Sequence, residues 1–144
     1  MSEIKKIGCV IVSHGQVANE LLSAAENVVG DLGHITAVSI GWHDEVESAK
    51  EQISRAIVQV SEGRGVLLLT DMFGGTPTNI SAMFYEQGEV EIVTGVNLPM
   101  VIKVANQNIE IPLTQMADEV ENQGKEAIYQ AGDLLIPKKM IKDA

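Results

Sequence analysis

Short apolar runs of strand length alternate with longer amphipathic segments, and this alternation restricts the fold more than any other feature of the sequence. The runs at 7–12, 35–40, 66–70 and 90–94 are apolar and rich in β-branched residues. The segments that follow them repeat apolar residues at helical spacing. This alternation predicts an α/β fold, doubly wound, with a mainly parallel sheet and helices on both faces.

Individual elements follow from the same patterns. The run at 66–70 has no polar alternation, which is typical of a strand buried on both faces of a parallel sheet. Asp44 and Thr78 are expected to cap the helices that follow them. The tail at 132–137 is expected to add an edge strand, because Pro137 suits an edge or an end. The expected helices lie within these ranges: 17–29, 46–60, 78–84, 100–104 and 113–128.

Size and charge narrow the class of protein. A chain of 144 residues is expected to form one domain, residues 1–144, that buries roughly two-thirds of its unfolded surface. The formal net charge of −10 disfavours nucleic acid and anionic membrane surfaces as partners, because both require a basic face. No apolar run approaches the ~18 residues that a membrane-spanning helix needs.

The amino terminus and the single cysteine indicate the compartment. Residues 1–6 lead into a strand without a signal-peptide pattern. Cys9 cannot form an internal disulfide, and its place inside an apolar run predicts a buried, inert thiol. We therefore expect a cytoplasmic protein.

Polar residues follow two of the expected strands at the end where parallel sheets bind ligands. His14 and Gly15 follow the first run, and Asp71 follows the third. The carboxyl ends of neighbouring strands share a crevice, so we expect Asp71 to lie within hydrogen-bonding reach of the His14 ring. A carboxylate on one ring nitrogen fixes the tautomer and leaves the other nitrogen free to act as a nucleophile.

A glycine-rich turn after Asp71 offers donors for an anion. Gly74, Gly75 and Thr76 present successive backbone N–H groups near the start of a helix, where the helix dipole favours negative charge. Gly15 allows close backbone approach at the first helix. Together these residues predict a histidine that carries a phosphoryl group beside an anion-binding loop.

Ordinary structural interpretations stay open for each of these residues. A loop histidine is most often a solvated side chain, Asp71 can cap a nearby turn, and Gly74-Gly75 can be only a tight turn. A binding module with an unreactive histidine is therefore an alternative. Trp42 and Phe73 flank the expected crevice, either as packing residues or as a contact rim for a partner protein.

Other chemistries fit the sequence less well. Histidines 14, 34 and 43 match no metal-ligand spacing, so we expect no metal, and His34 and His43 are expected to be structural or solvated. A hydrolase triad that includes Ser13 lacks a nucleophile elbow. The loop at 74–78 lacks the lysine of a Walker P-loop. A response-regulator receiver requires paired acidic residues after the first strand, and Ser13 and its neighbours do not supply them.

Three motifs, at 11–15, 70–79 and 95–100, together resemble the mannose-type enzyme IIA family of the bacterial sugar phosphotransferase system. The resemblance implies a doubly wound domain, usually a homodimer in which an edge strand is exchanged. It implies a histidine phosphotransferase whose active histidine is His14, supported by Asp71 and Thr76. The donor would be the small carrier HPr, the acceptor an enzyme IIB, and no cofactor is used.

The resemblance leaves the destination of the phosphoryl group open. The protein would feed a sugar transporter through peripheral association with a membrane permease, or act as a phosphorylation-dependent regulator. A third alternative is the phosphocarrier subunit of a dihydroxyacetone kinase, although the loop at 73–77 fits the sugar-transport branch better. Without a fused IIB domain in this sequence, we expect a free IIA protein. No lysine or arginine lies near His14 or Asp71 in the sequence, so we expect part of the countercharge to come from the donor protein.

Overall fold

Four parallel strands form the centre of the computed structural model, which describes residues 4–107 and 110–135. They lie in the order β2-β1-β3-β4, and all neighbouring pairs are parallel. The predicted α/β fold with a parallel sheet is confirmed. The strands are β1 (Gly8–His14), β2 (Ile35–Ile40), β3 (Val66–Thr70) and β4 (Val90–Thr94).

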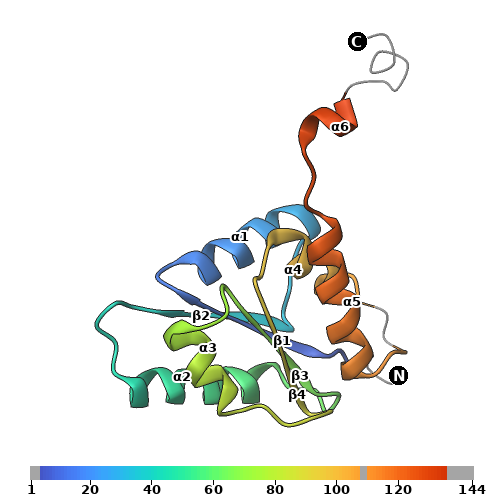
Figure 1. Ribbon diagram of the computed structural model, residues 1–144. Coiled ribbons are helices and arrows are strands. Elements are labelled where there is room, and N and C mark those ends of the chain that lie inside the picture. The colour runs from blue at the N-terminus through green and yellow to red at the C-terminus, as the bar shows by residue number, and fades with distance from the viewer. Residues whose placement is uncertain (1–3, 108–109, 136–144) are drawn as a thin grey trace.

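Helices cover both faces of the sheet, as predicted (Figure 1). One face carries α1 (Val17–Val29), α4 (Leu98–Ala105) and α5 (Leu113–Glu126). The opposite face carries α2 (Val46–Val60) and α3 (Gly75–Ala82). The short helix α6 (Ala131–Leu135) projects away from these layers (Figure 1).

Two apolar cores lie on either side of the sheet, because successive side chains of the central strands point to opposite faces. Ile11 and Leu67 face the core under α1, α4 and α5, whereas Val12 and Leu68 face the core under α2 and α3. Every residue of β3 is buried, which is why this run shows no polar alternation. Each fully buried side chain of this size stabilises the fold by about 1.5–3 kcal/mol. The central strands are therefore a rigid support for the residues at their carboxyl ends.

The predicted edge strand at 132–137 is wrong for the described part of that segment. Residues 131–135 form helix α6, and the N–H of Asp133 donates to the carbonyl of Gln130 at 3.0 Å. The backbone is thus bonded locally, as in a helical turn, and pairs with no described strand. Ile136 and Pro137 lie outside the described residues.

Both predicted helix caps are wrong for a shared reason, because each side chain bonds to a turn rather than to its helix. The carboxylate of Asp44 accepts the N–H of Gly41 at 2.7 Å and closes the loop between β2 and α2. Helix α2 begins after Glu45, whose side chain makes no capping bond. Thr78 lies inside α3, which begins after Gly74, and its hydroxyl donates to the carbonyl of Met72 in the loop after β3.

Cys9 is fully buried in β1, as predicted. Burial raises the pKa of its thiol far above the ordinary value, so the thiol stays protonated and unreactive. Across the described ranges, none of the helices combines the length and the apolar character that crossing a lipid bilayer requires.

Candidate functional site

His14 and Asp71 meet at the point where the winding of the sheet reverses. His14 is the last residue of β1, and Asp71 directly follows the neighbouring strand β3. The chain leaves β1 toward β2 and then returns to the other side of β1, so a crevice opens between the carboxyl ends of β1 and β3. There the Nδ1 atom of His14 lies 2.8 Å from Oδ2 of Asp71. The same oxygen accepts the backbone N–H of His14 at 2.9 Å.

The carboxylate of Asp71 is held on both of its oxygens. Its Oδ1 atom accepts the backbone N–H of Met72 at 3.0 Å, while Oδ2 accepts from His14. An ionised carboxylate can only accept hydrogen bonds, so Nδ1 of a neutral His14 ring is the protonated nitrogen. The lone pair then lies on Nε2.

The Nε2 atom faces the beginning of α3. A Cβ atom built on Gly75 would lie 3.0 Å from Nε2 of His14, so the ring rests directly against this glycine. Gly75 has a φ of +82°, a conformation that side-chain-bearing residues rarely adopt. The first N–H groups of a helix have no partner within the helix and carry partial positive charge. Gly75 and Thr76 begin α3 and line the same pocket as His14, which makes their N–H groups candidate donors for an anion bound there.

The site is open to solvent on one side. A pocket of about 490 Å³ is bounded by His14 and by the loops after β1, β2 and β3. The His14 side chain is 47 % exposed and that of Asp71 only 16 %, so another protein can reach the ring while the carboxylate is shielded. No lysine or arginine is among the lining residues, which are His14, Gly15, Ile40, Gly41, Trp42, Asp44, Gly75 and Thr76.

Two hydrogen bonds fix the turn that carries His14 into α1. The N–H of Gly15 donates to the carbonyl of Ile40 at 2.9 Å, so this amide is already bonded, and Gly15 forms a wall of the pocket. The buried hydroxyl of Ser13 accepts the N–H of Ala18 at 2.6 Å. Ser13 thus caps α1, whose N-cap residue Gln16 makes no side-chain capping bond to the helix backbone. Sequence reasoning missed this role, although a hydroxyl just before the turn was its visible signal.

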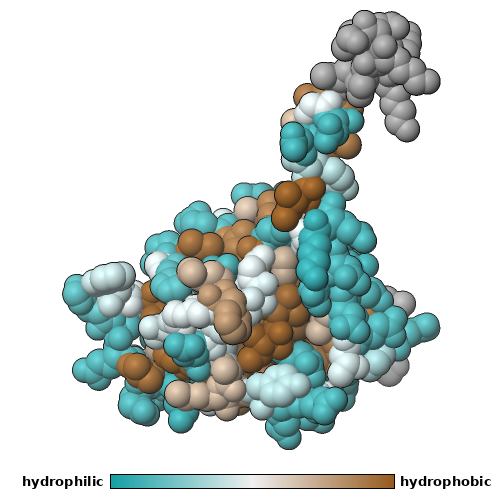
Figure 2. Space-filling model, viewed as in Figure 1, coloured by the Kyte–Doolittle hydropathy of each residue, from teal (hydrophilic) through white to brown (hydrophobic). Residues whose placement is uncertain are grey.

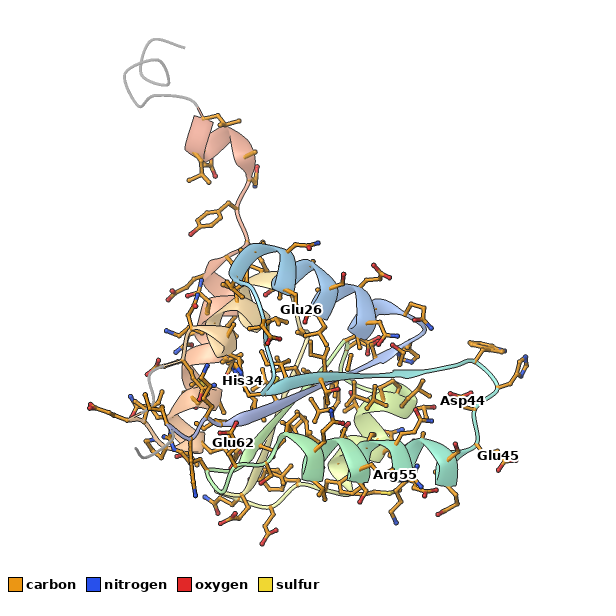
Figure 3. All side chains as sticks on the ribbon, turned by 180° about the vertical axis from the view of Figure 1, so that it is seen from behind. Glu26, His34, Asp44, Glu45, Arg55 and Glu62 are labelled. Carbon is orange, nitrogen blue, oxygen red and sulfur yellow. The ribbon has the colours of Figure 1, made fainter. Side chains whose placement is uncertain are left out.

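Trp42 and Phe73 are exposed, so the packing interpretation of these two aromatic residues is wrong. Trp42 is 92 % exposed and lines the pocket, and Phe73 is 81 % exposed in the loop after β3. Trp42 lies in the loop after β2, the same loop that carries Asp44, which Figure 3 labels beyond the end of the strand. Because the core ends with the strands, the loops have no apolar layer against which to bury aromatic rings.

The other two histidines lie apart from this arrangement. His34 is buried near the opposite end of β2 (Figure 3), where burial lowers the pKa of its imidazole. His43 is exposed, and its ring centroid lies 6.5 Å from that of Trp42. Within the residues that the structure describes, no group of three or more histidine, cysteine or acidic side chains is arranged to hold a metal ion.

The fold and the site define a class of protein: a doubly wound α/β domain whose candidate site lies where the winding of the sheet reverses. Comparison with known proteins gives the family. Residues 8–123 match the model of the EIIA-man family, described as the PTS system fructose IIA component. The chain therefore belongs to the mannose-type family of phosphotransferase-system IIA components, and the resemblance in the sequence is confirmed.

Two relatives and one solved structure illustrate the similarity. The PTS system mannose-specific EIIAB component of Escherichia coli (strain K12) is 28 % identical over 127 residues, which span 85 % of this chain but only 39 % of that protein. The PTS system fructose-specific EIIA component of Bacillus subtilis (strain 168) is 25 % identical over 130 residues, 90 % of this chain and 89 % of that protein. The mannose/sorbose specific IIA subunit from Enterococcus faecalis has a TM-score of 0.76 at 27 % identity, covering 87 % and 94 % of the two chains.

Proposed function

We propose that this protein carries a phosphoryl group for sugar uptake, accepting it on His14 from phosphohistidine of the carrier HPr and passing it to an enzyme IIB. The observation that supports the proposal is the 2.8 Å contact between His14 Nδ1 and Asp71, which leaves Nε2 facing an open pocket. Membership of the IIA family supports the choice of partners. In this role the protein works in the cytoplasm together with HPr.

The proposed transfer exchanges one phosphorus–nitrogen bond for another. The Nε2 lone pair of His14 attacks the phosphorus atom, and the donor histidine recovers the electron pair of the bond that breaks. Asp71 balances the positive charge that forms on the ring. The N–H groups at Gly75 and Thr76 stabilise the phosphoryl oxygens. Since the two bonds are alike in energy, positioning and charge stabilisation are sufficient for catalysis.

The names of the relatives favour the sugar-transport branch over a purely regulatory role or a dihydroxyacetone kinase subunit. They refer to mannose, fructose and sorbose systems. The direct test is incubation of the protein with labelled phosphoenolpyruvate, enzyme I and HPr. We expect acid-labile, alkali-stable label that maps to the peptide containing His14 and moves to an added IIB protein. Absence of label would support a binding module and refute the proposal.

Replacing Asp71 with asparagine is expected to slow phosphorylation of the protein by about 10- to 100-fold while retaining the fold. Asp71 accepts N–H groups on both oxygens, from His14 and from Met72. An asparagine has one oxygen and one NH₂ group, so it keeps one of these contacts at most and cannot balance the charge on the ring. The rate of label transfer from HPr measures the effect.

Asp118→Asn is the matched control for Asp71→Asn. It makes the same change of charge at an exposed position on α5, on the other face of the sheet from α3. We expect the rate of this variant to equal that of the unaltered protein. Equal rates for Asp71→Asn and Asp118→Asn would contradict the role proposed for Asp71.

Replacing Trp42 with alanine is expected to reduce the affinity for HPr by about tenfold, because exposed aromatic side chains beside a reactive group are typical anchors of transient interfaces. The side chain is 92 % exposed, so its loss leaves the core intact. We expect KM for phospho-HPr to rise with little change in kcat. Phosphorylation by the small donor phosphoramidate, which needs no docking surface, should be unchanged.

Tyr85→Ala is the control for Trp42→Ala. Tyr85 is also a largely exposed aromatic residue, but it lies after the carboxyl end of α3, near the start of β4 and away from the pocket. Its replacement should leave KM for phospho-HPr unchanged. An unchanged KM for Trp42→Ala would exclude Trp42 from the docking surface.

We also propose that two copies associate along β4, the free edge of the sheet. Among the described strands, β4 pairs with β3 alone, and beyond an antiparallel bridge between its first residue, Val90, and Glu86 its outer edge is unpaired. All five residues of β4 are only partly buried. A groove of about 370 Å³ follows this edge between β4 and α5. Figure 2 shows hydrophobic residues exposed on this side of the molecule. An unpaired edge of this kind is open to another chain.

Sedimentation velocity at micromolar concentration tests the association. We expect a dimer, and we expect Ile92→Lys, which places a charge in the groove beside β4, to yield monomers. A monomer for the unaltered protein would contradict the proposal without affecting the assignment of His14.

A further inference from the structure

A buried hydroxyl on α3 contacts the residues on both sides of Asp71. Thr78 is the fourth residue of α3 and is 7 % exposed. Its Oγ1 lies 3.0 Å from Oγ1 of the buried Thr70 and also bonds to the carbonyl oxygen of Met72. A carbonyl can only accept, so the single hydroxyl proton of Thr78 goes to Met72. Thr70 must then donate to Thr78.

The residues at the two ends of this hydrogen-bond chain bracket Asp71 in the sequence. Thr70 immediately precedes Asp71, and Met72 immediately follows it. The residue whose carbonyl binds Thr78 also donates its N–H to Oδ1 of Asp71 at 3.0 Å. The other carboxylate oxygen holds the His14 ring at 2.8 Å. Hydrogen bonds at Met72 and Asp71, joined by the covalent structure of these two residues, therefore link α3 to the imidazole.

We propose that Thr78 is a positioning residue for the transfer at His14, acting through Met72 and Asp71. The inference rests on the proposed function of His14 as the phosphoryl acceptor. The Thr78 hydroxyl keeps the loop after β3 in the orientation that presents the carboxylate to Nδ1. Without that carboxylate the imidazole favours the tautomer with its proton on Nε2, which has no lone pair there for attack.

Ser81 is a second buried hydroxyl on α3, and it makes no hydrogen bond to the loop after β3. It lies on the same helix and is fully buried, yet its oxygen has no partner among the described residues. Thr78, by contrast, bonds to two groups next to Asp71. Ser81→Ala is therefore a matched control, because it removes a buried hydroxyl from α3 without breaking a contact to the loop.

The test compares Thr78→Val, Thr78→Ser and Ser81→Ala by two measurements. The first is the rate of phosphorylation by phospho-HPr. The second is the pair of ¹⁵N chemical shifts of the His14 ring, which report the nitrogen that carries the proton. For Thr78→Val we expect the rate to fall about tenfold and the population protonated on Nε2 to rise, because the loop loses the bond that orients Asp71. Thr78→Ser should restore both values, and Ser81→Ala should change neither.

Two results would overturn the inference. One is an unaltered tautomer population in Thr78→Val, whatever its rate, because a structural role alone predicts that result. The other is an equal effect of Ser81→Ala. If Thr78→Val does not fold, Thr78→Ala removes the hydroxyl without added bulk and is judged by the same criteria. If HPr does not phosphorylate the unaltered protein, the proposed function is refuted. The tautomer measurement needs no partner protein, so it still decides whether Thr78 positions the His14 ring.

Discussion

Replacing His14 with alanine is expected to abolish phosphorylation by HPr, with a residual rate at least about a thousandfold below wild type, because the nucleophile itself is lost. Among the described residues that line the pocket there is no cysteine and no other histidine, so no second thiol or imidazole there can replace the ring. The side chain is 47 % exposed, so its removal should cost little stability. Label incorporation from phosphoenolpyruvate and the thermal unfolding midpoint measure the two effects.

His43→Ala is the control for His14→Ala. His43 is the other exposed histidine and lies in the adjacent loop, next to Trp42. We expect its replacement to leave the labelled fraction unchanged at saturating HPr. Label on the His14→Ala protein, or its loss from the His43→Ala protein alone, would move the acceptor to His43.

Replacing Gly75 with alanine is expected to slow phosphorylation by at least about a hundredfold, because it misplaces the reacting atoms. The new Cβ would lie 3.0 Å from Nε2 and 3.1 Å from Cε1 of His14. The methyl group must then displace either the imidazole or the incoming phosphoryl group. The same protein should still fold, because Gly75 is exposed.

Gly74→Ala separates this contact from backbone strain. Gly74 has a φ of +86° and Gly75 one of +82°, so alanine at either position costs about 1–2 kcal/mol of stability. A Cβ on Gly74 meets nothing within 4 Å. We expect similar losses in the free energy of unfolding for the two variants but a large loss of rate only for Gly75→Ala. Equal rates would show that strain, and not contact with His14, limits the reaction.

Much of the fold was predictable because the sheet is buried on both faces. Its strands are short apolar runs, so the bounds of β2, β3 and β4 coincide with those runs. The meeting of His14 and Asp71 was predictable for a related reason. In a doubly wound parallel sheet, a crevice opens at the carboxyl ends of the two strands where the direction of the connections reverses. Their chemical roles stay predictions.

The wrong predictions concern polar residues whose partners lie outside their own helix. Asp44 and Thr78 have the side chains of helix caps, but a turn and the loop after β3 bind them instead. The segment that becomes α6 reads as a strand because Leu134 and Leu135 are apolar, yet both are exposed in the structure. Local patterns do not reveal such tertiary choices.

The exposure of Trp42 was also beyond the sequence pattern. Aromatic residues next to strands are usually packed, and only the three-dimensional arrangement shows that the loop after β2 extends past both cores. The chain has a net charge of −10, and the described residues that line the pocket include no lysine or arginine. Both features fit a site that is completed by a partner with positive charge, consistent with a carrier that exchanges its phosphoryl group between proteins.

The most direct test of the account is ¹⁵N and ³¹P NMR of the phosphorylated protein with labelled histidine rings. We expect one phosphorus resonance, coupled to Nε2 of His14, while Nδ1 stays protonated and bonded to Asp71. Phosphorus bound to Nδ1 of His14, or to either of the other two histidines, would contradict the account.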